Sequence, residues 1–173
     1  MAVDMLPPYC GLAGHTSQKA KLGARVEVWM SATCRFVAFY AVCATQATTA
    51  ATDIVAWDTT TVAGAVSADT SAYQDEIAGL PITGADATLA IAEYAWIQSW
   101  GGKIVTPDGT VIGNTLLGDG SVANKESIMA HASTDGMVDT WATDAGKYIG
   151  VAMEDDAPAL TIFVLACAPA GMA

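Results

Sequence analysis

Serine, histidine and aspartate, the residue types of a nucleophilic relay, occur close together at His131, Ser133 and Asp135. In such a relay the histidine takes the proton of the serine hydroxyl, and the aspartate orients the histidine. That geometry is assembled from separate parts of a fold, and one short stretch does not supply it. The chain also has no Gly-X-Ser-X-Gly sequence that would expose a serine on a sharp turn. We therefore expect a polar loop at this position and a protein that is not an enzyme.

Residue types that ligate metals do not fall at a recognised spacing. The two histidines, His15 and His131, are far apart in the chain, and no Cys-X-X-Cys pair occurs. Glu154, Asp155 and Asp156 offer oxygen ligands of the kind that Ca²⁺ prefers, but their spacing is not that of an EF-hand loop. Successive acidic residues at a turn are usually solvated, so we expect no metal and no cofactor.

The aromatic residues are the remaining candidates for ligand binding. Tyr94, Trp96 and Trp100 recur at even positions of TLAIAEYAWIQSW (88–100), so that an extended strand would place them on one face. With Trp141 they could form a platform on which sugars or bases stack. Core packing and a subunit interface are the alternatives, because both are rich in aromatic residues. We favour core or oligomer interface for these four aromatics.

Charge is scarce and unevenly distributed. Charged residues make up 14% of the chain and hydrophobic residues 53%, whereas average soluble domains are about 25% charged. A surface so poor in charge predicts burial against other subunits. Residues 1–35 carry four basic and two acidic residues, and residues 36–173 carry three basic and sixteen acidic ones. The acidic body would repel nucleic acid, and we expect Lys19, Lys21 and Arg25 in the basic part to contact an acidic partner.

The lengths of the apolar runs and the positions of the cysteines indicate the environment in which the protein works. The longest apolar runs, 36–44 and 159–173, are shorter than the roughly 20 residues of a spanning helix, so we expect no membrane partner. The cysteines form no evident disulfide framework, and two of them lie in apolar runs. Free thiols are favoured, although a disulfide stays open for a chain that ends in an extracellular particle. The four cysteines are Cys10, Cys34, Cys43 and Cys167.

The spacing of apolar residues and turn residues predicts an all-β fold, a compact β-sandwich or barrel-like module. Residues 1–22, punctuated by proline and glycine, are expected to form an extended N-terminal arm. Residues 23–173 then form one β-domain, or two β-subdomains that meet near 85–90. About ten strands are expected, with a hairpin at 103–113 and helical turns near 69–76 and within 124–133.

Three stretches together resemble a known family. They are KLGARVEVW (21–29), EYAWIQSWG (93–101) and GKYIGVAMEDDAPALTIFVLAC (146–167). In this order, with strands cut by glycine and aspartate between them, they resemble the capsid decoration, or cement, proteins and related head proteins of tailed bacteriophages. The chain departs from the pattern at Ala95, where such proteins often have glycine, and the Ala/Thr-rich residues 44–70 have no counterpart.

The resemblance implies a structural virion protein without catalytic residues. Such a protein sits as a homotrimer on the outer surface of the capsid, binds the major capsid protein and stabilises the shell. The capsid contact is then expected at the basic residues Lys19, Lys21 and Arg25. Two alternatives remain: another minor head or tail structural protein, and a β-domain that binds carbohydrate or a host surface through Trp96 and Trp100.

Overall fold

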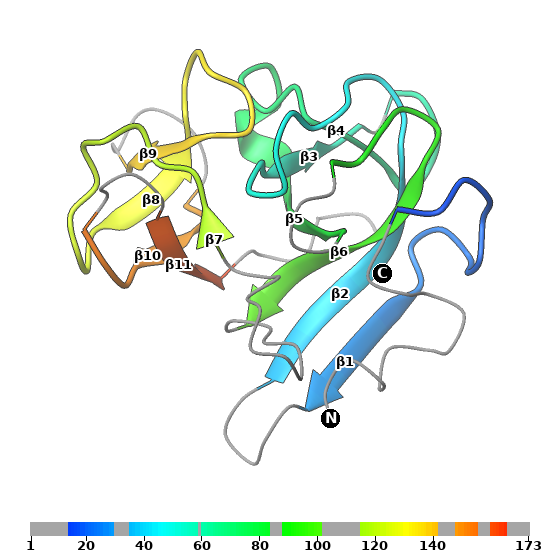
Figure 1. The fold of residues 1–173 in the computed structure, drawn as a ribbon, viewed down its shortest axis with the longest axis horizontal. Coiled ribbons are helices and arrows are strands. Elements are labelled where there is room, and N and C mark those ends of the chain that lie inside the picture. Colours follow the sequence, from blue (N-terminus) through cyan, green and yellow to red (C-terminus); the bar gives the residue numbers. More distant parts are fainter. Residues whose placement is uncertain are drawn as a thin grey trace.

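The computed structural model describes residues 14–29, 35–58, 60–83, 88–101, 115–141, 148–155 and 160–165. Within these residues the chain forms eleven β-strands and one short 3-10 helix, η2 (Gln74–Glu76). The predicted all-β, barrel-like fold is confirmed. Figure 1 shows a barrel at the centre and right of the molecule, with a smaller group of strands at the left. No helix in the described residues is long and apolar enough to cross a membrane.

Five strands close the barrel. Going round it, they pair in the order β2–β4–β3–β5–β6, and β6 returns to β2 along seven residue pairs. A sixth strand, β1, lies antiparallel to β2 outside the ring. The bounds are β1 Arg25–Trp29, β2 Arg35–Cys43, β3 Val55–Trp57, β4 Ala65–Ser67, β5 Ile77–Ile82 and β6 Tyr94–Gly101. β2 is the longest strand because it pairs with β1, β4 and β6.

The remaining strands form a small lobe continuous with the barrel sheet. β11 pairs with the end of β6, and the order then runs β11–β10–β8–β9, with β7 on the other side of β11. The bounds are β7 Thr115–Leu116, β8 Ser127–Ala130, β9 Val138–Thr140, β10 Gly150–Ala152 and β11 Leu160–Leu165. One uninterrupted sheet therefore links both parts (Figure 1).

Three hydrophobic clusters hold this arrangement together. All five barrel strands contribute to the first, which includes Phe39, Trp57 and Ile97. The second, around Tyr40 and Trp96, is covered by residues of the N-terminal segment 20–26. The third joins side chains of β3 and β5 to the inner face of the small lobe. Residues 14–22 therefore lie against the barrel: His15 bridges Tyr94, and the Lys19 N–H donates to the Tyr40 hydroxyl at 3.0 Å.

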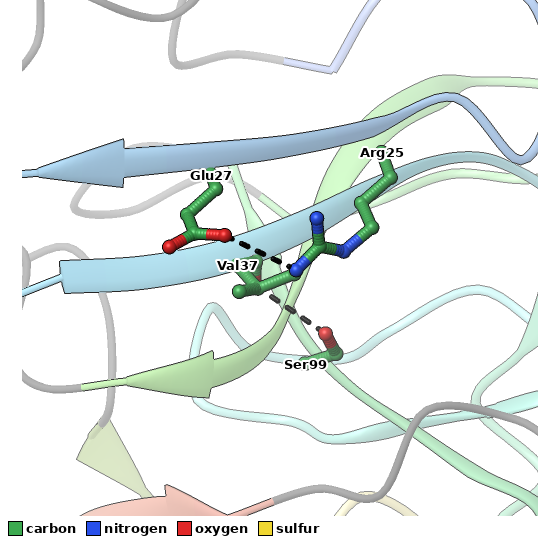
Figure 2. Close-up of polar contacts among 4 residues, drawn as sticks. All are labelled: Arg25, Glu27, Val37 and Ser99. Carbon is green, nitrogen blue, oxygen red and sulfur yellow. Dashed lines mark hydrogen bonds and ion pairs between the residues drawn. The ribbon is translucent and has the colours of Figure 1, made fainter.

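A β-bulge changes the face on which Trp100 lies. Val37 pairs with Trp100, but the next residue of β2, Ala38, pairs with Gln98, so Ser99 is the extra residue. Its hydroxyl lies 3.4 Å from the carbonyl oxygen of Val37 (Figure 2). Beyond the bulge the alternation is inverted, and Trp100 packs with the barrel interior rather than with Trp96. The prediction that Trp96 and Trp100 share a face is wrong for this reason.

The loop 131–136 joins the small lobe to the barrel. The Asp135 carboxylate accepts hydrogen bonds from Gln46 Nε2 (2.8 Å) and the Ser71 N–H (3.0 Å). The Gly136 N–H donates to Thr70 Oγ1 at 2.9 Å, and its carbonyl accepts the Ile54 N–H at 3.0 Å. Four hydrogen bonds to separate barrel loops therefore fix the orientation of the lobe.

One predicted local element is wrong, and another lies outside the described residues. The stretch 124–133, for which we expect a helical turn, contains the strand β8. Its composition suits a helix, but pairing with β9 and β10 and burial of Ile128 and Ala130 outweigh that weak preference. Lys125, at φ 71°, also starts the segment in a conformation that no α-helix has. The helical turn expected near 69–76 is present as η2. The hairpin expected at 103–113 lies outside the described residues.

Candidate functional site

His131, Ser133 and Asp135 lie on one turn but do not form a proton relay. The Nδ1 atom of His131 accepts the backbone N–H groups of Ser133 (3.2 Å) and Thr134 (3.0 Å). The Asp135 carboxylate instead contacts barrel loops, where the bonds to Gln46 and the Ser71 N–H outweigh partial burial and lower its pKa. Asp135 therefore does not orient the imidazole: it ties the loop to the barrel, whereas His131 holds the turn within the loop itself.

A cluster that the sequence does not reveal surrounds the other side of His131. One ligand atom each of Asp119, His131 and Asp139 lie within 4.8 Å of one another. The sheet brings them together, because Gly118 bridges Val138 and the His131 N–H donates to the Met137 carbonyl. Desolvation by burial raises the pKa of Asp119. Two hydrogen bonds from Ser121 and the electrostatic effect of the nearby His131 oppose this, and overall the pKa is lowered.

Part of this donor set is already engaged within the lobe. The His131 Nδ1 atom accepts two backbone N–H groups. The Ser121 hydroxyl lies within hydrogen-bond distance of both carboxylates, at 2.7 Å from Asp119 and 3.2 Å from Asp139. Of the acidic run that could have ligated Ca²⁺, Asp155 accepts the Asn124 N–H at 2.9 Å, and Asp156 lies outside the described residues.

The aromatic residues do not form an open platform. Trp96 is 2% exposed and meets the Tyr40 ring edge-on at 5.2 Å between centroids, while Tyr94 stacks on Tyr40 at 6.1 Å. Trp100 is partly buried against the barrel interior. Trp141 is different: it is 38% exposed and lies just past β9 on the small lobe. Of the four aromatic residues, Trp141 has the largest exposed fraction and is the one best placed to contact a partner.

The buried carboxylates of the barrel hold loops in place. Asp53 is 3% exposed and accepts the N–H and hydroxyl of Thr49 and the N–H of Ala50. Asp58 is 1% exposed, and its hydrogen bonds, above all that from the Thr45 hydroxyl, lower its pKa to about 2. The lowered pKa leaves Asp58 without a proton to give near neutral pH, and the hydrogen bonds of both carboxylates make them structural anchors.

Two groups of charged residues stand out at the surface, although the exposed Glu76 on the barrel and the exposed Lys125 on the small lobe interrupt the separation of sign. Lys19, Lys21 and Arg25, all exposed, form what we call the basic strip; Arg25 is ion-paired to Glu27 at 3.3 Å (Figure 2). On the small lobe, Asp119, Asp139, Trp141 and Met153 form what we call the acidic face. In Figure 1 the segment that carries the strip (dark blue) and the small lobe lie at opposite ends of the long axis.

Comparison of the chain with protein-family models, with curated proteins and with solved structures finds no match.

Proposed function

We propose that this chain is a structural virion protein that decorates the outer surface of a bacteriophage capsid and stabilises the shell. It acts as a homo-oligomer, a homotrimer on the sequence resemblance, and its partner is the major capsid protein. The observation that carries the proposal is the position of the exposed Lys19 and Lys21 at one end of a single all-β body whose other end, the small lobe, has a net negative charge. Such an arrangement suits docking between large surfaces better than binding of a small ligand.

The hydrogen bonding of the described residues supports the same role. Asp53, Asp58 and Asp135, which are buried or half-buried, bind backbone and hydroxyl groups of neighbouring loops. Each of these bonds restrains a connection between strands, and the loop at Asp135 restrains the whole small lobe. A body that resists deformation is what a shell under internal pressure needs from a clamp.

The experiment compares capsids of the encoding phage assembled with and without this protein. Both are heated and then diluted abruptly from high salt, and the released DNA is measured by its accessibility to nuclease. We expect capsids without the protein to release DNA at lower temperature, and purified protein added back to restore the resistance. Equal resistance of the two kinds of capsid would refute the proposal.

A further inference from the structure

The basic strip lies along residues 19–25. Ala20, Leu22 and Ala24 pack against the cluster around Tyr40, whereas Lys19, Lys21 and Arg25 are exposed. A turn separates Lys21 from Arg25: the Ala24 N–H donates to the Lys21 carbonyl at 2.9 Å, and Gly23 has φ 77°. Residues 14–25 contain no acidic residue, but Arg25 is ion-paired to Glu27 at 3.3 Å, so Lys19 and Lys21 supply most of the positive charge of the strip.

The acidic face arises from the register of the small lobe. Met129 pairs with Asp139, Ser127 pairs with Val151, and the Ser127 carbonyl accepts the Trp141 N–H, so these residues share the side of the sheet opposite to Ile128. On that side Met129 is buried, whereas Trp141 is exposed. The alternate residues, Ile128 and its neighbours, point into the core. The described residues of the lobe, 115–141 and 148–155, hold six carboxylates and one lysine.

The outer side of the lobe also exposes apolar area beside this charge. Trp141 is 38% exposed and Met153 is 48% exposed. Tryptophan in particular is enriched among residues that dominate binding energy, and methionine adapts to the shape of its partner. The lobe thus exposes two large apolar side chains on a surface of net negative charge, and it suits a partner that presents lysine or arginine.

We propose that this partner is the basic strip of a second copy of the chain, bound head to tail. The two surfaces are different and lie at opposite ends of one body, so the contact is heterologous and leaves one strip and one face free after each addition. If such a series closes into a ring, every copy has both its basic strip and its acidic face bound to a neighbour. The inference rests on the proposed homo-oligomer and supplies its interface; it assigns Lys19, Lys21 and Arg25 to a neighbouring subunit rather than to the shell.

Charge reversal tests this contact in a way that general damage to the fold cannot imitate. One chain carries Lys19→Glu and Lys21→Glu, and another carries Asp119→Lys and Asp139→Lys. In each, both ends have the same sign, and we expect self-association to weaken by more than about 100-fold, because like charges across an interface cost several kcal/mol. An equimolar mixture restores complementarity, and it should form complexes with even numbers of subunits only. Sedimentation velocity measures both results.

Three controls make the outcome decisive. The Asp119→Asn, Asp139→Asn chain keeps the shape of both side chains and should also associate more weakly. A chain with all four reversals should regain the wild-type oligomer. Raising the salt from about 0.05 M to about 0.5 M should weaken the wild-type oligomer, since screening shortens the reach of exposed charges.

The result separates this inference from the proposed function. Oligomers that survive reversal of the strip, or a mixture that stays monomeric, would overturn the head-to-tail contact. If reversal of the strip leaves the oligomer intact but abolishes binding to shells, the strip contacts the capsid, and the inference is wrong while the proposed function stands. A wild-type chain that is monomeric at micromolar concentration would overturn the inference, and the capsid-stability experiment would then decide the decoration role alone.

Discussion

Replacement of Gly136 by alanine is expected to destabilise the protein through one identified contact. Gly136 has φ 76°, and a Cβ there would lie 2.6 Å from Cγ of the buried Asp53. The left-handed backbone costs an alanine about 1–2 kcal/mol. Overpacking a core site costs a further 1–3 kcal/mol or so. Asp53 has little room to retreat, because three hydrogen bonds from Thr49 and Ala50 hold its carboxylate.

The expected loss is therefore about 2–5 kcal/mol, or a fall in melting temperature of roughly 4–20 °C for a chain of this size. Gly120→Ala is the matched control: Gly120 has φ 91°, and a Cβ there would meet no atom within 4 Å. It should lose only the backbone cost of about 1–2 kcal/mol. Thermal unfolding followed by circular dichroism compares the two variants.

A double substitution isolates the contact further. Asp53→Gly alone destabilises the loop that Asp53 anchors, but it also removes Cβ, Cγ and Oδ1, the atoms that a Cβ at position 136 would strike. In the Asp53→Gly background, Gly136→Ala should cost no more than Gly120→Ala does. If Gly136→Ala and Gly120→Ala lower the melting temperature equally in the wild-type background, the close packing of lobe on barrel at this point is refuted.

Three further predictions concern the barrel. Gly79→Ala should prevent barrel closure and yield unfolded or aggregated protein by circular dichroism, because at φ 136° its Cβ would lie 2.0 Å from the Gln98 carbonyl oxygen; a folded variant would contradict this. Asp58→Asn should be less stable than wild type near neutral pH, and the difference should shrink as the pH falls from about 4 towards 2, since the pKa is lowered from 3.8 to about 2 in the fold. A pH-independent difference in denaturant unfolding would refute that anchor. Cys43, whose pKa burial and Glu93 raise to about 11, should resist iodoacetamide at pH 8 until the protein unfolds, as peptide mass spectrometry would show; rapid native labelling would contradict its burial.

Strands with alternating polar and apolar residues, or with continuous apolar residues, can be predicted from the sequence because burial of their side chains determines where they form. The segments RVEVW and RFVAFYAVC lie in β1 and β2 as expected, since their β-branched and aromatic residues suit a pleated, buried surface. β8 is not predictable in this way. SIMA offers no β-branched run, and only the neighbours β9 and β10, placed by the rest of the chain, make it a strand.

The bulge in β6 shows a second limit of pattern reading. The period of two predicts the sides of Ala95, Trp96 and Ile97 correctly. An extra residue at Ser99 then inverts the pattern, and nothing in the letters QSWGG marks the inversion. Its cause is closure of the barrel: β6 must pair with β2, β5 and β11, and a bulge supplies the bend that lets one strand leave the ring.

The distribution of charge over the molecule follows from the sequence and the fold together. The sequence shows a basic N-terminal part and an acidic remainder, which by itself suggests only a positive arm on a negative body. The fold lays residues 14–24 along the barrel, so the strip is held in place, and it carries the small lobe to the opposite end. A positive group held rigidly loses little freedom on binding. Because the strip and the lobe lie at opposite ends of one molecule, the proposed head-to-tail contact brings them together between two copies.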